Sequence, residues 1–349
     1  MQFDFGGDDE IRFERQGKAG LVRLTRTSAL NALTHDMIKA LDRALRTWEQ
    51  DPEIACVIVE GEGRAFCAGG DVVAAYKAGQ QGAPAYDFFH DEYVLNARIG
   101  RFPKPYVSFL NGIVMGGGAG ISVHGSHRIV TENTLFAMPE TGIGFFPDVG
   151  GGAFLPHLKH NFGFYLALTG NRIRWGDCLQ SGIATHAVLA KDLDAVREKL
   201  IATGDVEAAL TNLQYPDYET SAEARLIIAD CFEAASLSAC LGALEQAMNA
   251  GSKDAADILK VIATRSPTSL AVTFRQINEA RLLKLDDVMR MEYRIACRML
   301  EGHDFYEGVR AVLIDKDGAP VWQPSDLDLV TADQVNAYFA PLGEKELVL

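Results

Sequence analysis

The sequence predicts an α/β protein with a helical C-terminal region. In the first part of the chain, short β-branched apolar runs alternate with segments that carry apolar residues at helical spacing. Such alternation is typical of α/β architectures. Beyond Trp175 the pattern becomes mostly helical. We therefore expect a mixed core over residues 1–215, followed by a mostly helical region over residues 216–349.

Residues 34–50 predict an amphipathic helix. Met37, Leu41 and Leu45 recur at helical spacing and fall on one face, and Thr34 precedes them as a cap. A small-residue buried helix is expected from residue 119 to about residue 125. Apolar runs bounded by turn residues predict buried strands at residues 19–25, 54–60, 105–110, 127–131 and 134–138.

The C-terminal region carries a series of helical segments. Apolar residues recur at helical spacing in each of them, and residues 215–220 form a polar linker. The expected helices are residues 187–202, 221–235, 238–250, 254–264, 268–283 and 286–301.

Composition limits the partners and the compartment. The net charge of −14 argues against a nucleic-acid partner, which requires clustered Lys and Arg, but it allows an anionic ligand held by backbone N–H groups. No window approaches the roughly 18 continuous apolar residues of a membrane span. Residues 1–10 are acidic and unlike a secretion signal or an Arg-rich presequence. The scattered cysteines lack metal spacing. We expect reduced thiols and a cytoplasmic location.

Two glycine-rich segments follow predicted strands. Residues 61–71 read GEGRAFCAGGD and residues 111–120 read NGIVMGGGAG. Glycine permits close backbone approach, so two such turns can direct two N–H groups at one oxygen atom, helped by a helix start whose amides have no intrahelical partner. Such donors stabilise an enolate or a tetrahedral oxyanion. Each segment alone is equally consistent with a tight turn, and neither matches a phosphate-binding pattern.

A third segment places two carboxylates in apolar surroundings. Residues 136–152 read FAMPETGIGFFPDVGGG and contain Glu140 and Asp148. Burial raises the pKa of a carboxyl group and suits it to acid–base work. Taken alone, however, these residues favour helix caps or ion pairs with Arg. Cys67 has no implied base beside it and is not expected to be a nucleophile.

The three segments together resemble the crotonase superfamily of acyl-CoA enzymes, through the motifs AFCAGGD, NGIVMGGGAG and FAMPETGIGFFPDVGGG in this order. The resemblance runs from about residue 22 to residue 186 and resumes at residues 304–313 and 320–322. The further motifs SVHG, GIATH, SPTSL and HDFYEGVRAVLIDKD look specifically like the 3-hydroxyisobutyryl-CoA hydrolases of that superfamily. The resemblance implies a crotonase-like ββα spiral core with a helical C-terminal region, and an acyl-CoA thioester as substrate.

The resemblance also implies a role for each site residue. The backbone N–H groups of Gly70 and Gly117 would form an oxyanion hole for the thioester carbonyl, with Gly69 as the alternative first donor. Glu140 would be the catalytic carboxylate, and Asp148 its partner near the 3-hydroxyl of the substrate. The implied substrate-binding positions are Glu92, Ala68, Gly69 and Asp71.

The expected reaction is hydrolysis of (S)-3-hydroxyisobutyryl-CoA, an intermediate of valine breakdown, to the free acid and CoA, with 3-hydroxypropionyl-CoA as a second substrate. Glu140 either attacks the thioester to form an anhydride or activates water, and the sequence leaves both routes open. No metal or redox cofactor is implied. The superfamily forms trimers or dimers of trimers, so a homo-oligomer is possible, but the oligomeric state stays open.

Two alternative functions compete with this interpretation. Enoyl-CoA hydratases use two glutamates, and the position of the first is Gly120 here, which cannot transfer a proton. A non-catalytic acyl-CoA binding protein would not need both Glu140 and Asp148. Outside the motifs, Arg26 and Lys316 either reach a CoA phosphate or form surface ion pairs. His124 and His127 are expected to be structural groups with satisfied hydrogen bonds.

Overall fold

The computed structural model describes residues 1–349 and divides into two compact units. The first unit comprises Met1–Asp71, Asp91–Phe136 and Ile173–Glu219, and the second comprises Val72–His90, Ala137–Arg172 and Thr220–Leu349. This division differs from the contiguous one at residues 215 and 216 that the sequence suggested. Val72–His90 and Ala137–Arg172, which were expected in the core, belong to the same unit as the C-terminal helices. Contacts between distant segments define a unit, and the sequence pattern does not show such contacts.

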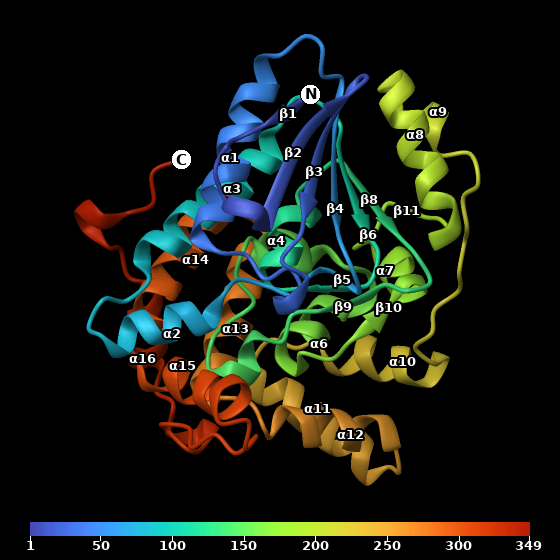
Figure 1. The fold of residues 1–349 in the computed structure, drawn as a ribbon. Helices are drawn as coiled ribbons and strands as arrows, with labels where there is room; N and C mark the ends of the chain where they lie inside the picture. The colour runs from blue at the N-terminus through green and yellow to red at the C-terminus, as the bar shows by residue number, and fades with distance from the viewer. The chain divides into compact units, whose positions relative to one another are not determined.

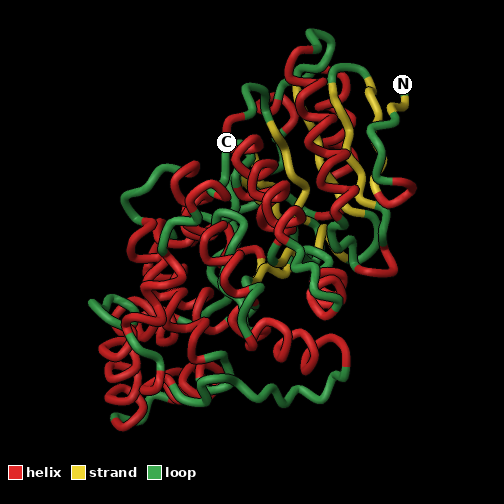
Figure 2. Tube along the Cα trace, turned by 90° about the vertical axis from the view of Figure 1, so that its left-hand side faces the viewer, coloured by secondary structure: helices red, strands yellow, loops and turns green.

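A seven-stranded sheet forms the centre of the first unit. Its order is β1-β2-β3-β4-β6-β8-β11. The first three strands pair antiparallel, whereas β3, β4, β6, β8 and β11 run parallel. The labelled strands lie side by side in Figure 1, and Figure 2 shows strands as yellow segments among red helices. The strands are β1 (Gln2–Phe3), β2 (Ile11–Gln16), β3 (Ala19–Leu24), β4 (Cys56–Gly61), β6 (Tyr106–Leu110), β8 (His127–Val130) and β11 (His186–Ala187).

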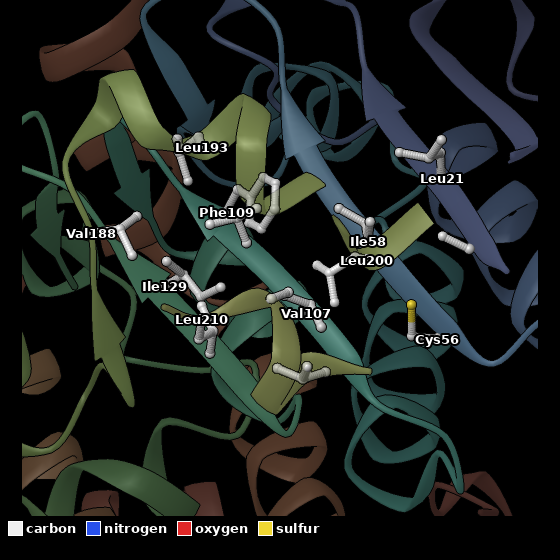
Figure 3. Close-up of a cluster of buried hydrophobic side chains, with 14 residues drawn as sticks. Leu21, Cys56, Ile58, Val107, Phe109, Ile129, Val188, Leu193, Leu200 and Leu210 are labelled. Atoms are coloured by element: carbon white, nitrogen blue, oxygen red, sulfur yellow. The ribbon is translucent and has the colours of Figure 1, made fainter. Parts of the chain in front are cut away.

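One face of this sheet is covered by α8 (Leu193–Thr203) and α9 (Val206–Ala209). Leu200 of α8 lies over Ile58 and Val107 of the parallel strands in a buried apolar cluster (Figure 3). Successive side chains of a strand point to opposite faces, so alternate residues of β3, β4 and β6 enter this cluster. Burying a Leu or Val side chain contributes roughly 1.5–3 kcal/mol.

The opposite face of the sheet is covered by α1 (His35–Gln50). A β-carbon on Gly20 would lie 2.7 Å from the Trp48 ring, so the helix packs directly on the backbone of β3. The Thr34 hydroxyl accepts a hydrogen bond from the Met37 N–H at 3.3 Å, which confirms the predicted cap.

A second, four-stranded sheet has the order β10-β9-β7-β5. Strands β5 and β7 pair in parallel, so their carboxyl ends lie at the same edge. Each of these two strands lies within one of the glycine-rich segments, so residues 68–71 and residues 116–118 follow the strands at the same edge, and the second segment runs into α4. The elements are β5 (Ala65–Cys67), β7 (Ile113–Met115), β9 (Leu135–Ala137), β10 (Ile173–Arg174), α3 (Tyr86–Arg101), α4 (Gly117–Val123) and α7 (Trp175–Ser181).

The second unit is built mainly of helices. Within it α11 and α12 lie side by side (Figure 1), and none of the helices in the structure has both the length and the apolar character of a membrane span. The helices are α2 (Val72–Gln80), α5 (Gly151–Phe154), α6 (Phe162–Thr169), α10 (Ala222–Cys231), α11 (Leu237–Asn249), α12 (Lys253–Ile262), α13 (Pro267–Ala280), α14 (Leu285–Met299), α15 (His303–Val309) and α16 (Ala332–Phe339).

The predicted helix over residues 187–202 is wrong at its start. His186 and Ala187 form the edge strand β11, paired in parallel with Ile129 and Val130 of β8, and the α-helix begins only at Leu193. A short edge strand takes its conformation from the strand it pairs with, which local helical spacing does not show.

Candidate active site

The first candidate donor, Gly70, lies in an extended stretch that pairs with Leu33. The Leu33 N–H donates to the Gly69 carbonyl at 2.8 Å, and the Asp71 N–H donates to the Leu33 carbonyl at 2.9 Å. Successive backbone groups of an extended chain point to opposite sides, so the Gly70 N–H points away from Leu33. Gly69 has φ +124°, a conformation that favours glycine.

The second candidate donor, Gly117, is the first residue of α4. The Ala119 and Gly120 N–H groups both donate to the Gly116 carbonyl, so the Gly117 N–H precedes the first intrahelical bond of the helix. Amides at this position are available to an external acceptor. Gly116, with φ +47°, makes the sharp turn that starts the helix.

The two donor glycines lie next to each other. A β-carbon on Gly117 would lie 3.0 Å from the Gly70 nitrogen and 2.6 Å from Oε1 of Glu92. Glu92 comes from the part of α3 in the first unit and is 1% exposed. The structure therefore brings together Gly70, Gly117 and Glu92, three of the residues selected from the sequence, around the start of α4.

Cys67, at the end of β5, supports this arrangement without being a nucleophile. A β-carbon on Gly118 would collide with the Cys67 carbonyl, so α4 packs on the strand end with no room for a side chain. Burial raises the pKa of the Cys67 thiol to about 12, and the thiol contacts the Gly69 carbonyl at 3.5 Å. The reactive thiolate is therefore disfavoured at neutral pH.

The neighbouring residues Ala68 and Asp71 are held by hydrogen bonds to residues that precede α1. The Ala68 N–H donates to the Leu30 carbonyl at 3.0 Å, and Asp71 accepts from Arg26 at 2.8 Å. Arg26 also pairs with Glu10 at 2.9 Å. Of the two roles that the sequence left open for Arg26, the structure contains the ion pair.

In the second unit, Glu140 opens a short 3₁₀ turn, Glu140–Ile143, and is 6% exposed. Its carbonyl accepts from the Phe145 N–H at 3.0 Å and from the Gly144 N–H that closes the turn. Gly144 has φ +70°, and a β-carbon there would collide with the Asp304 carbonyl. The turn that presents Glu140 therefore rests directly on the start of α15.

The C-terminal motif explains why the resemblance resumes near residue 304. Asp304 accepts a hydrogen bond from the Ser266 hydroxyl at 2.6 Å, and the Ser266 N–H donates to the Thr141 carbonyl at 3.2 Å. A β-carbon on Gly308 would collide with the Ile143 backbone. Motifs far apart in the sequence thus hold the Glu140 turn, and we assign them a structural role in this unit.

Asp148 is 5% exposed and lies in a loop of the second unit, beside a buried residue that the sequence analysis missed. That residue is Glu292 of α14, which is fully buried. Burial, with a smaller contribution from the nearby Asp148 charge, raises the pKa of Glu292 to about 8, against hydrogen bonds from Gly152 and Gly150 that lower it. The signal for Glu292 was a lone glutamate on an otherwise apolar helix face.

His127, which follows α4, has the structural setting that was expected. His127 accepts or donates a hydrogen bond with the Ser126 hydroxyl at 2.8 Å, and its ring stacks on His186 at 5.8 Å. Burial lowers the pKa of both rings. The backbone of His124 caps the end of α4.

Comparisons with known proteins give the family. The chain matches the enoyl-CoA hydratase/isomerase family model over residues 19–339. It is 46% identical to the mitochondrial 3-hydroxyisobutyryl-CoA hydrolase of Danio rerio, covering 97% of this chain and 92% of that protein. The identity to the Homo sapiens protein of the same name is 44%, over 97% and 90% of the two chains.

Solved structures agree on the fold. A protein from Mycobacterium thermoresistibile described as a carnitinyl-CoA dehydratase superposes with a TM-score of 0.91 at 41% identity, covering 98% of this chain and 99% of that one. An enoyl-CoA hydratase from Rhodobacter sphaeroides 2.4.1 superposes with a TM-score of 0.88 at 36% identity, covering 98% and 100%.

The expected cytoplasmic location is wrong. The relatives that share 44–46% identity are named mitochondrial proteins, which points to the mitochondrion instead. Charge and composition describe a folded surface, whereas a targeting signal that is recognised apart from the fold selects the compartment. An acidic surface with unpaired cysteines is compatible with either place.

The α/β fold, the adjacency of Gly70 to Gly117 at the start of α4 and the near full-length similarity lead to one conclusion. The chain belongs to the enoyl-CoA hydratase/isomerase family, the crotonase superfamily, and within it is similar to the 3-hydroxyisobutyryl-CoA hydrolases.

Proposed function

We propose that the chain hydrolyses the thioester of (S)-3-hydroxyisobutyryl-CoA to the free acid and CoA, with 3-hydroxypropionyl-CoA as a second substrate. The observation that carries this proposal is the adjacency of Gly70 and Gly117, whose N–H groups are not used by the strand pairing or by the helix. The similarity to proteins named 3-hydroxyisobutyryl-CoA hydrolase supports the choice of acyl group. A place in valine breakdown follows from that substrate.

In the proposed mechanism the two glycine amides bind the thioester carbonyl oxygen. Charge builds on this oxygen when the carbonyl carbon is attacked, and fixed N–H donors stabilise it more than water does because they need no reorganisation. Removal of one such donor typically costs about 10²–10³ in rate. The start of α4 adds the favourable potential of a helix N-terminus. Glu92, beside Gly117, would contact the substrate.

The two carboxylates either supply the nucleophile or activate it, and they carry the proton transfers. Either Glu140 attacks the carbonyl carbon, forming a mixed anhydride that water then cleaves, or it takes a proton from a water molecule that attacks directly. In both routes the C–S bond breaks, CoA leaves as its thiol after gaining a proton, and the acyl group ends as a carboxylate. Asp148 would orient the 3-hydroxyl and assist proton transfer.

Hydration of an enoyl-CoA is the second candidate, since solved structures described as a hydratase and a dehydratase share the fold. Such a reaction needs one group for the proton of water and another that protonates carbon. The position that carries the first of these in hydratases is Gly120, a residue with no side chain. Hydrolysis needs no proton donor there, so Gly120 favours hydrolysis.

The reaction as proposed needs no metal and no redox cofactor, because water is the only co-reactant and the thioester carbonyl is activated by N–H donors. CoA enters as part of the substrate. The polarising groups are backbone amides rather than a Lewis acid.

The test is to follow free thiol with a thiol-reactive dye after adding (S)-3-hydroxyisobutyryl-CoA, 3-hydroxypropionyl-CoA or crotonyl-CoA to the purified chain. The proposal predicts rapid thiol release from the two 3-hydroxyacyl esters, and no loss of the conjugated absorbance of crotonyl-CoA. Loss of that absorbance without thiol release would identify a hydratase. Tight binding of the esters with neither change would identify a binding protein.

A further inference from the structure

The loop that carries Asp148 contains a β-branched residue, Val149, in the left-handed region. Val149 has φ +53° and Gly150 has φ +82°. These two residues are the centre of a β-turn that the Gly151 N–H closes by donating to the Asp148 carbonyl at 2.8 Å. A β-branched side chain such as that of Val149 is nevertheless strongly disfavoured in the left-handed region. Such a conformation persists only where the surroundings fix it.

Two side chains of the second unit fix this backbone on both sides of Asp148. Glu292 of α14 accepts from the Gly150 N–H through Oε2 at 2.6 Å and from the Gly152 N–H through Oε1 at 2.8 Å. Gln276 of α13 donates through one nitrogen to the Pro147 carbonyl and to Oε1 of Glu292, each at 2.8 Å.

The contact of Glu292 and Gln276 with the loop is fully buried and closely packed. Glu292 and Gln276 are both 0% exposed. A β-carbon on Gly152 would lie 2.8 Å from the Ala280 β-carbon and 3.1 Å from both Val288 and Glu292. The loop therefore lies directly on α13 and α14.

A buried carboxyl group is an expensive way to hold a loop. Burying a carboxyl group costs free energy that only good hydrogen bonds offset, and a neutral acceptor such as an amide or hydroxyl oxygen could bind the same backbone N–H groups without burying an ionisable group. The charge of Asp148 close by adds to it. Strain and desolvation stored in one loop are typical of a site whose geometry matters for function.

We propose that Glu292, supported by Gln276, is the positioning residue of the reaction, and that it acts by fixing the backbone on which Asp148 is mounted. This inference rests on the proposed function, in which Asp148 meets the 3-hydroxyl of the substrate. Glu292 itself is enclosed by the loop and does not touch substrate. Misplacement of a catalytic group by about 1 Å can cost about 10² in rate, which sets the size of the expected effect.

The test compares Glu292→Gln with Ile258→Ala, a cavity variant in α12 that weakens the same unit without touching the loop. Glu292→Gln keeps the side-chain volume but removes one acceptor. Hydrogen exchange of the Gly150 and Gly152 amides should speed up at least tenfold in Glu292→Gln and not in Ile258→Ala. The kcat of Glu292→Gln for (S)-3-hydroxyisobutyryl-CoA should fall about 10²-fold with KM within threefold, whereas Ile258→Ala should keep its kcat per folded molecule.

Unchanged exchange, or faster exchange with kcat within twofold of the parent, would overturn the proposal. If Glu292→Gln does not fold, Gln276→Leu serves instead. The Gln276 oxygen has no partner, so this change removes only the two hydrogen bonds from its nitrogen, and kcat should fall about tenfold. A parent chain that releases no thiol at all would refute the proposed function, while the exchange arm would still decide whether Glu292 holds the loop.

Discussion

A β-carbon on Gly117 would lie 3.0 Å from the amide nitrogen of Gly70. The two backbones approach this closely because Gly117 has no side chain. Gly117→Ala should therefore displace the donors, and kcat for the thioester should fall about 10²–10³-fold, the usual cost of losing an oxyanion donor. Steady-state thiol release checks this.

A matched control exists on the other unit. Gly242 lies within α11, and nothing lies within 4 Å of a β-carbon added there. Gly242→Ala should leave thiol release unchanged and raise stability by about 0.5–1 kcal/mol. Equal activity in Gly117→Ala and Gly242→Ala would contradict the proposed role of the Gly117 N–H as an oxyanion donor.

Asp148→Asn should lose activity without losing stability. The Asp148 charge raises the pKa of the buried Glu292, so removing this charge lowers the free-energy cost of ionising Glu292 in the folded chain. We expect kcat to fall about 10²-fold while the thermal midpoint stays the same or rises. A lower midpoint together with full activity would mean that Asp148 is a structural residue.

The same pair predicts a dependence of stability on pH. The folded-state pKa of Glu292 is about 8, above its ordinary value of 4.5. The folded chain then holds a proton that the unfolded chain releases, so this contribution is complete below pH 4.5 and is lost as pH rises to about 8. Urea unfolding at pH 5, 6.5 and 8 should show a smaller decline in Asp148→Asn than in the parent. An equal decline would argue against coupling of the two groups.

The Glu140 turn should depend on a glycine that touches no substrate. Gly144 has φ +70° and faces the Asp304 carbonyl. Gly144→Ala should cost roughly 1–3 kcal/mol of stability and also lower kcat, because the turn that presents Glu140 must move. Thermal unfolding and thiol release measure the two effects, and an unchanged midpoint would contradict the described packing.

Cys67 should be chemically silent. Because burial raises the pKa of its thiol to about 12, the thiolate is scarce at pH 8 and the folded chain should resist iodoacetamide at this position. Cys67→Ala should keep at least half of kcat. Mass spectrometry of the labelled peptide checks the first point, and rapid labelling with loss of activity would restore Cys67 as a candidate nucleophile.

Much of the first unit could be predicted because the signals are local. The cap of α1 at Thr34 follows from residues within one turn, and the apolar runs of β4 and β6 are long enough to identify as buried strands. The glycine-rich segments were found from their position after strands. The adjacency of Gly70 and Gly117 then depends on parallel pairing of β5 and β7.

Other features depend on contacts between distant segments. The edge strand β11 forms because it pairs with β8. The apolar spacing around residue 187 predicts a helix instead. Glu292 lies more than a hundred residues from the loop that it binds, so the sequence near Asp148 does not predict this contact. Each unit likewise consists of three separate stretches of the chain, so a division at a single residue could not describe the two units.

The most direct test of the hydrolytic mechanism is thiol release from (S)-3-hydroxyisobutyryl-CoA by the parent chain and by Glu140→Gln, with binding of the ester measured by calorimetry. The amide keeps the shape of the side chain but can neither attack the carbonyl nor take a proton from water. We predict that turnover falls about 10³-fold or more while the ester still binds. Near-normal turnover by Glu140→Gln would contradict the mechanism.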